Sequence, residues 1–240
     1  MTKNPLKILQ ISKSFEGKIV LDNVDFAVKQ GQIFGFVGLN GVGKTTLIKI
    51  LLDLLDQDFG DVEIFGINKV LPKSRREICY LPEKFYPSSN LTGREFIKFT
   101  LSFYKQKINE KNLAEICEKL DLDYKILDKK ITKYSKGMTQ KLGLIAVFLT
   151  KVKLIILDEP MSGLDVAARI KLKKEIIDYK KQGGTIFFSS HILSDIEEIC
   201  DEIAILNNTK IVFNGCPKTF KIKHSSDNLE EAFLKEIELT

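Results

Sequence analysis

Short apolar runs alternate with stretches of helical periodicity along most of the chain. Seven runs have the length and residue types of β-strands, and they span residues 7–11, 20–28, 33–37, 61–65, 154–157, 185–189 and 203–206. Strands that alternate with helices favour a fold in which helices cover a sheet. The pattern therefore predicts an α/β protein.

Between residues 82 and 150 the pattern changes to that of helices alone. Thr92 and Glu95 have the spacing of a capping box, and apolar residues follow at helical intervals, namely Phe96, Phe99 and Phe103. A further helix is predicted at residues 140–149. We interpret residues 83–150, approximately, as a helical insertion in the α/β domain.

A charged helix is predicted at residues 166–181, where a pair of glycines ends it. The strand at residues 185–189 follows, and Ser194 and Glu197 then have the spacing of a second capping box. The strand should therefore deliver His191 at its carboxyl end, between the strand and the next helix.

The final residues, 221–240, are predicted to form a short tail after a domain of residues 1–220. A polar linker in this tail precedes an amphipathic helix at residues 229–239. Three apolar residues share one face of that helix, namely Leu229, Phe233 and Ile237. This arrangement favours packing over a role in recognition.

Composition limits the possible classes of protein. A chain of 240 residues with 44% apolar content is long enough for one large domain with an insertion. The formal charge of +5 comes from 37 basic and 32 acidic residues spread along the chain, which is typical of a solvated surface rather than a nucleic-acid tract. The four cysteines form no CxxC pair, so neither a zinc knuckle nor a redox motif is indicated.

No stretch has the pattern of a targeting or membrane-spanning segment. The first residues alternate charged and apolar side chains, whereas a signal peptide needs an apolar core. The apolar stretch at residues 142–149 is far shorter than the roughly 20 residues that span a bilayer. We therefore expect a cytoplasmic protein whose membrane role, if it has one, depends on a partner.

A phosphate-binding motif lies between the predicted strand 33–37 and a helical pattern at residues 47–55. It reads G-x-x-x-x-G-K-[ST], and its residues are Gly38, Leu39, Asn40, Gly41, Val42, Gly43, Lys44, Thr45 and Thr46. Strand, loop and helix stand in the order that a P-loop, or Walker A motif, requires. The alternative, a glycine-rich turn, should match this pattern by chance only about once in a hundred chains of this size.

Each part of this motif has a chemical reason. Gly41 and Gly43 leave room for backbone N–H groups to converge on phosphate oxygens, and the helix that starts near Lys44 adds its positive end. The ammonium group of Lys44 suits the β- and γ-phosphates, the Thr45 hydroxyl suits Mg²⁺, and the Thr46 hydroxyl suits a phosphate.

Two carboxylates follow the uniformly apolar strand at residues 154–157, namely Asp158 and Glu159. Ligands of open α/β sheets lie at the carboxyl ends of the strands. Asp158 is therefore expected to hold Mg²⁺, directly or through water, and Glu159 to act as general base on a water. A solvated acidic turn is the alternative, and the buried strand and the P-loop weigh against it.

With these motifs in order, the chain resembles the ATP-binding subunit of ATP-binding cassette (ABC) transporters along nearly its whole length. The segment YSKGMTQ is similar to the family's signature motif, which covers Tyr134, Ser135, Lys136, Gly137 and Met138. The resemblance implies that this motif caps the γ-phosphate held by a partner subunit, in a homodimer or a heterodimer.

Other elements are assigned from the same resemblance. Ser162, Gly163, Leu164 and Asp165 resemble the D-loop of the family. His191 resembles its switch histidine, a catalytic residue that contacts the γ-phosphate. Phe15 lies where the family places an aromatic ring on adenine, although its spacing alone would suggest a core residue.

The resemblance also implies a fold, an activity and a partner. The fold would be a P-loop NTPase core, RecA-like with a mainly parallel sheet and an antiparallel β subdomain, plus an inserted α-helical signature subdomain. The chain would bind ATP and Mg²⁺, hydrolyse ATP, and drive a separate transmembrane permease from the cytoplasmic face of the membrane. Residues 83–98 would face that permease, and no nucleic acid is expected as a partner.

The chain departs from the general family at a few positions. Glu83 stands where a glutamine usually binds metal and water, and a carboxylate there can still bind Mg²⁺. Tyr134, Lys136 and Met138 replace Leu, Gly and Gln, which resembles a branch rich in exporters. Two rival functions remain, a soluble ABC ATPase that acts on nucleic acid or ribosomes and a regulatory module that binds ATP without hydrolysis.

Overall fold

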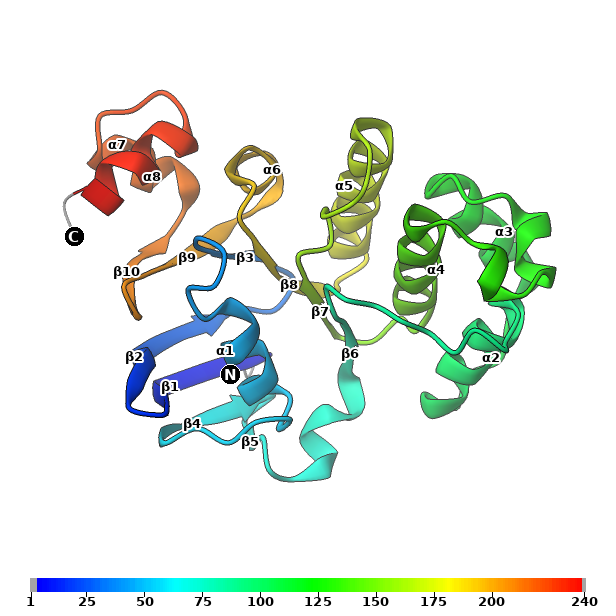
Figure 1. Cartoon of the computed structure of the whole chain (residues 1–240), viewed down its shortest axis with the longest axis horizontal. Helices are drawn as coiled ribbons and strands as arrows, with labels where there is room; N and C mark the ends of the chain where they lie inside the picture. Colours follow the sequence, from blue (N-terminus) through cyan, green and yellow to red (C-terminus); the bar gives the residue numbers. More distant parts are fainter. Residues whose placement is uncertain (1–3, 239–240) are drawn as a thin grey trace.

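The computed structural model describes residues 4–238, and its strands form two sheets (Figure 1). The smaller sheet is antiparallel with strand order β2-β1-β4-β5. Its members are β1 (Leu6–Phe15), β2 (Lys18–Val28), β4 (Phe59–Ile64) and β5 (Ile67–Asn68). This sheet agrees with the antiparallel β subdomain expected from the sequence.

The larger sheet has six strands in the order β10-β9-β3-β8-β7-β6. Its members are β3 (Ile33–Val37), β6 (Ile78–Leu81), β7 (Leu154–Asp158), β8 (Thr185–Ser190), β9 (Glu202–Asn207) and β10 (Lys210–Gly215). All neighbours are parallel except the pair β9 and β10. The α/β class and the seven predicted strands are confirmed, and β5, β6 and β10 are additional.

The central strands are apolar on both faces because each face covers a separate core. In β3, Phe34 and Phe36 point into the core shared with the antiparallel sheet and α1 (Lys44–Leu51), whereas Ile33 and Val37 point to the opposite core under the other helices. The rings of Phe26, Phe34, Phe36 and Phe187 stack on one another in the first core. Burial on both faces explains the continuous apolar runs.

The predicted helical insertion consists of α2 (Gly93–Phe103), α3 (Glu110–Lys119) and α4 (Lys136–Leu149), with two short helical turns between α3 and α4. These helices form a lobe beside the β6 edge of the larger sheet (Figure 1). The capping box of Thr92 and Glu95 is confirmed at the start of α2. Helix α4 begins at Lys136, four residues before the predicted start.

The second predicted capping box, of Ser194 and Glu197, is wrong. Helix α6 (Leu193–Ile199) starts after Ile192, and no side chain caps it. Glu197 turns away from the start of α6, pairs with Lys221, and accepts a 2.8 Å hydrogen bond from the backbone N–H of Leu229. The helix before it, α5 (Val166–Lys181), has the predicted bounds.

Two short helices end the described chain, α7 (Pro217–Lys223) and α8 (Leu229–Glu238). They lie near the β10 edge, at the end of the sheet opposite the helical lobe (Figure 1). Leu229 and Phe233 are buried and Ile237 packs beside them, as the amphipathic pattern predicts. The predicted helix included Leu239, which lies outside the described residues, and the predicted boundary at residue 220 lies within α7.

Candidate functional site

The P-loop connects the buried strand β3 to α1, in the predicted order. Gly41 has a φ of 80° and Gly43 a φ of 121°, which are backbone conformations that other residues rarely adopt. A Cβ on Gly43 would lie only 3.0 Å from the side chain of Val20. The sequence therefore needs glycine here for the shape of the loop as well as for access to its N–H groups.

Lys44 is held in place by contacts on two sides. Its Nζ donates hydrogen bonds to the carbonyl oxygens of Gly38, at 2.7 Å, and Leu39, at 3.2 Å. The same atom lies 3.0 Å from Glu159 Oε1, and both side chains are buried. In a buried pair the attraction between the two partners offsets the cost of removing each from water. The P-loop and the acidic pair, 115 positions apart in sequence, therefore meet at one point.

Asp158 lies at the end of β7, almost completely buried, and is bound from two sides. The Thr45 hydroxyl donates to its Oδ2 at 2.8 Å, and the Ser189 hydroxyl donates to its Oδ1 at 2.5 Å. The Ser189 oxygen also accepts the backbone N–H of Glu159 at 2.9 Å. Sequence reasoning missed Ser189, although two serines directly before His191 at the end of an apolar strand were a signal for it.

Glu159 has an unusual backbone and a well-fixed side chain. Its φ of 49° lies in the left-handed region, which is costly for a residue with a Cβ and is often found at functional sites. Oε2 lies 2.8 Å from His191 Nδ1 and accepts the backbone N–H of His191 at 3.4 Å. Oε1 is buried and accepts no well-aligned hydrogen bond among residues 4–238, so it keeps a lone pair for a further donor.

Lys44, Glu159 and His191 line one cleft of about 540 Å³, and Asp158 lies buried behind it. Its walls come from the P-loop, the segment after β6, the end of β7, the loop after it and the end of β8. The lining residues are Asn40, Gly41, Gly43, Lys44, Thr45, Thr46, Glu83, Lys84, Glu159, Ser162 and His191. The structure thus brings together the sequence-predicted P-loop, Glu83, Glu159 and His191.

The signature-like segment lies apart from this cleft. Ser135 caps α4, where its Oγ accepts the backbone N–H of Met138 at 3.2 Å. Tyr134 and Lys136 line a second cleft of about 390 Å³ together with Ser162 and Gly163. Gly137 and Met138 occupy the first turn of α4. No residue from 134 to 138 lines the first cleft.

The D-loop-like segment lies between the two clefts. The backbone N–H of Ser162 donates to the carbonyl oxygen of Glu159 at 3.0 Å, and Leu164 N–H donates to Met161. Asp165 caps α5, because its Oδ1 accepts the backbone N–H of Ala168 at 2.8 Å. The D-loop-like segment is therefore bonded to Glu159 at its first residue, and it passes beside the signature-like segment before α5 begins.

Phe15 and Glu83 are both exposed. Phe15 ends β1 with 44% of its surface exposed, and it is not among the residues that line the first cleft. Glu83 lines that cleft but is open to solvent.

The residues around Thr45 fit a magnesium ion. Thr45 Oγ1 and Asp158 Oδ2 are 2.8 Å apart, and Mg²⁺ prefers such oxygen ligands while keeping waters and phosphate oxygens around it. Residues 4–238 contain no cluster of three or more His, Cys, Asp or Glu side chains that could hold a metal by themselves. A cation here would therefore need ligands from a nucleotide and from water.

Comparison with known proteins agrees with this geometry. The family model described as ABC transporter matches residues 21–162, which is more than half of the chain, and the chain belongs to this family. The chain is 38% identical, over 81% of its length, to an uncharacterized ABC transporter ATP-binding protein of Synechocystis, and it spans only 56% of that relative.

Two further comparisons cover almost whole chains. The lantibiotic transport ATP-binding protein SrtF of Streptococcus pyogenes is 32% identical, with 97% of each chain covered. A solved structure described as the ATP-binding subunit of an ABC transporter is 28% identical in sequence, with a TM-score of 0.87. The match covers 96% of this chain and 98% of the chain in that structure. The fold expected from the sequence is thereby confirmed.

Proposed function

We propose that the chain binds MgATP and hydrolyses it to drive a membrane transporter. One observation carries this proposal above the others, namely that Lys44, Glu159 and His191 meet in one cleft with the P-loop. A protein that only bound ATP would need the P-loop but not a buried carboxylate oriented by a histidine.

Each of these residues would have a separate role. The P-loop N–H groups would bind the phosphates, and Thr46 would contribute a hydroxyl. Lys44 would exchange its contact with Glu159 for the β- and γ-phosphates. Thr45 and Asp158 would hold Mg²⁺, and Glu83, which lines the same cleft, would bind it through water. When bound, this cation supplies charge neutralisation at the phosphates.

Glu159 would act as general base on the attacking water. Its buried Oε1 has hydrogen-bonding capacity left, so it can accept a proton from water once Lys44 has moved to the phosphates. His191 holds Oε2 and would also contact the γ-phosphate. Ser189 fixes the backbone of Glu159, which keeps the carboxylate oriented. Phe15 would stack on adenine from the edge of β1.

The signature motif supports a dimer. Ser135 and the start of α4 form a site for an anion, yet they lie outside the cleft that contains Lys44. Two copies arranged head to tail would place the signature of one copy, residues 134–138, on the γ-phosphate held by the other. The D-loop of each copy, residues 162–165, would lie between the two sites. The partner subunit can be a second copy or a related chain.

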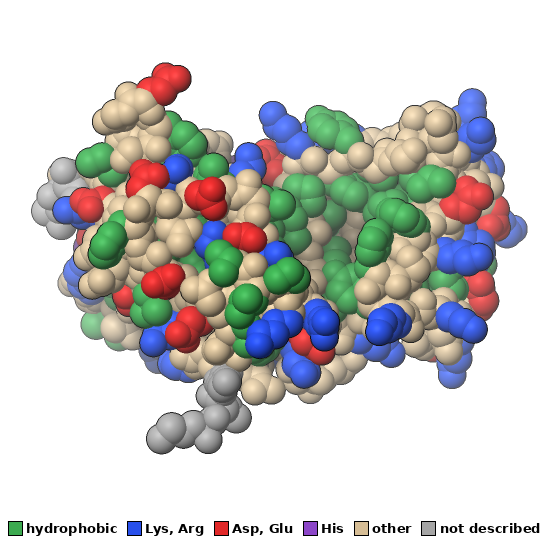
Figure 2. All heavy atoms as spheres, turned by 90° about the horizontal axis from the view of Figure 1, so that it is seen from below, with side chains coloured by type: hydrophobic (Ala, Val, Ile, Leu, Met, Phe, Trp, Pro, Cys, Tyr) green, Lys and Arg blue, Asp and Glu red, His purple; other side chains and the backbone are tan. Residues whose placement is uncertain are grey.

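A separate permease is expected to bind the helical lobe. No helix among residues 4–238 is both long and apolar enough to span a bilayer. Exposed aromatic residues gather on the lobe and the segment that leads to it, since Tyr86 is 85%, Phe99 57% and Phe103 70% exposed. Figure 2 shows hydrophobic side chains in a hollow between the lobe and the rest of the molecule, with Lys and Arg along one edge. Exposed apolar patches with polar rims are typical of protein interfaces.

The permease surface can be tested with matched aromatic substitutions. In its host cells the chain should sediment with membranes, and the double variant Phe99→Ser and Phe103→Ser should remain in the supernatant. Phe59→Ser is the control, because Phe59 is also exposed, at 65%, but lies on the antiparallel sheet. Equal sedimentation of all three proteins would contradict the permease surface and would leave the ATPase proposal intact.

The dimer can be tested with the purified chain. Glu159→Gln should form a dimer with MgATP in size-exclusion chromatography, because ATP that is not hydrolysed keeps the two copies together. Adding Ser135→Arg should abolish this dimer, since a large side chain would fill the phosphate site at the start of α4. A dimer that tolerates Ser135→Arg would show that the signature segment does not meet the partner's ATP.

A further inference from the structure

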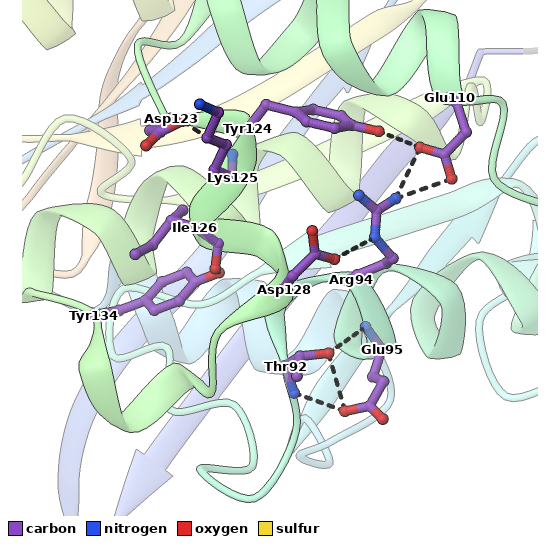
Figure 3. A network of polar contacts seen from close by, with 10 residues as sticks. All are labelled: Thr92, Arg94, Glu95, Glu110, Asp123, Tyr124, Lys125, Ile126, Asp128 and Tyr134. Atoms are coloured by element: carbon purple, nitrogen blue, oxygen red, sulfur yellow. Dashed lines mark hydrogen bonds and ion pairs between the residues drawn. The ribbon is translucent and has the colours of Figure 1, made fainter.

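Tyr134, the residue directly before Ser135, points its hydroxyl at Ile126 (Figure 3) and packs against Gly93 at the start of α2. Its hydroxyl donates a 2.8 Å hydrogen bond to the carbonyl oxygen of Ile126. The hydroxyl also lies so close to Gly93 that a Cβ on Gly93 would be 2.2 Å from it. Burial raises the pKa of Tyr134 to about 12, so the hydroxyl keeps its proton at neutral pH.

Backbone hydrogen bonds also connect the segment before Tyr134 to the start of α2. Ile131 N–H donates to the carbonyl oxygen of Leu91 at 2.9 Å, and Gly93 N–H donates to that of Lys129 at 3.4 Å. Thr92 and Lys130 form an isolated antiparallel bridge between these bonds. Residues 91–93 and 129–131 are therefore paired like two short strands, and the second stretch leads within four residues to Ser135.

The segment that ends at Gly93 begins in the nucleotide cleft. Glu83 lines that cleft, and Tyr86, three residues later, is among the most exposed aromatic side chains of the chain. The segment then reaches Leu91 and the capping box of α2. The chain thus runs from the cleft, past the proposed permease surface, to the side chain of Tyr134.

The surrounding lobe is held together by a charged cluster that does not include Tyr134 (Figure 3). Arg94 binds Glu110 through two hydrogen bonds of 2.9 and 2.8 Å and Asp128 through one of 2.7 Å. Tyr124 donates its hydroxyl to Glu110. These contacts connect α2, α3 and the turn at Tyr124–Asp128, so the lobe should move as one body.

We propose that Tyr134 is a positioning residue that fastens Ser135 to residues 91–93, so that a movement of residues 83–93 displaces the signature serine. Since Ser135 is assigned to the partner's ATP, this inference rests on the proposed function. Where the general family has leucine, this chain has Tyr134, and its hydroxyl adds the hydrogen bond to Ile126. Gly93 has no Cβ and so leaves the space that this hydroxyl occupies.

Two tyrosines of the lobe provide a matched pair of variants. Tyr134→Phe and Tyr124→Phe each remove one hydroxyl and one hydrogen bond, but only Tyr134 is the direct neighbour of Ser135 in the chain. In the Glu159→Gln background, Tyr134→Phe should weaken the MgATP-dependent dimer roughly threefold to tenfold, which is the value of one hydrogen bond. Tyr124→Phe should leave the dimer unchanged, and both should bind ATP as the parent does.

Gly93→Ala provides a second, independent test of the contact between Gly93 and Tyr134. Its Cβ would displace the Tyr134 hydroxyl, so this variant should weaken the dimer more than Tyr134→Phe does. The double variant Gly93→Ala and Tyr134→Phe should recover part of this loss, because the atoms then nearest to the new Cβ, Leu127 Cδ2 and the Cζ of residue 134, are each 3.2 Å away. This rescue tests the contact between Gly93 and Tyr134, and the comparison with Tyr124→Phe separates a positioning role from a merely structural one.

Hydrogen exchange separates this inference from the proposed function. In the full chain, Tyr134→Phe should speed exchange at the amides of Met138 and Thr139, which bind Ser135, and at Gly93, whereas Tyr124→Phe should not. A missing dimer in Glu159→Gln would overturn the proposed two-site function, and exchange would still decide the role of Tyr134. Equal exchange and equal dimer affinity in the two phenylalanine variants would overturn the inference.

Discussion

His191 Nδ1 lies 2.8 Å from Glu159 Oε2, although the two residues are 32 positions apart in sequence. They meet because β7 and β8 are parallel neighbours, with Asp158 opposite Ser189, so both chains leave the sheet at the same edge. The histidine therefore fixes one oxygen of the carboxylate and leaves the other, Oε1, directed at Lys44.

His191→Ala should lower kcat by about a hundredfold, the lower range for a residue that assists proton transfer, and should weaken ATP binding by a smaller factor. The larger loss comes from the freed carboxylate of Glu159, and the smaller one from the lost contact with the γ-phosphate. His224, the other histidine of the chain, pairs with Glu236 near α7 and α8. His224→Gln is the control and should keep the kcat of the wild type. Similar losses in the two variants would contradict the role given to His191.

Lys44→Ala should weaken ATP binding roughly tenfold to a hundredfold, the range for a lost charge-assisted hydrogen bond. Lys49 is also on α1, one turn and a half later, but is exposed, so Lys49→Ala should bind ATP normally. Affinity is best measured with a fluorescent ATP analogue at low protein concentration. If both lysine variants bound alike, the P-loop assignment would fail.

Glu197→Ala should lower the free energy of unfolding by about 1–3 kcal/mol at pH 7, because the N–H of Leu229 and the ammonium of Lys221 lose their acceptor. Glu118→Ala is the control, because Glu118 is exposed on α3, and this variant should keep the free energy of unfolding of the wild type. Chemical unfolding of the three proteins measures the difference.

The same contact predicts a pH dependence. Burial alone would raise the pKa of Glu197, but the hydrogen bonds from Lys221 and Leu229 outweigh it and the pKa lies below the ordinary 4.5. A carboxyl with a lowered folded-state pKa stabilises the fold above its unfolded pKa and stops doing so as the pH falls through the folded value. The stability gap between wild type and Glu197→Ala should therefore be constant above about pH 5 and shrink below pH 4.5. A gap that does not change with pH would contradict the charged contact.

The sequence predicted the elements whose signal is local. The strand before the P-loop and the strand before Asp158 are apolar on both faces, and the motifs that follow them contain their own chemistry. By contrast, β6 has only four residues and β10 is half exposed, so neither has a strong apolar pattern. Their strand character comes from pairing with β7 and β9.

The wrong prediction at Glu197 and the omissions at the site come from contacts between residues far apart in the sequence. Glu197 has the spacing of a cap, yet two partners 24 and 32 positions away compete for its carboxylate and win. Ser189 connects Asp158 to Glu159 only because two strands are neighbours, a relation that spacing does not reveal. The contact of Tyr134 with Gly93 likewise depends on the folding of the lobe.

Phosphate release by the purified chain, compared with that of Glu159→Gln at saturating MgATP, tests the central claim most directly. The account predicts steady release by the wild type and at least a hundredfold slower release by the variant, with ATP bound equally well, because the amide cannot accept the proton of the attacking water. Equal rates in the two proteins, fast or negligible, would contradict the assignment of Glu159 as the base of an ATPase.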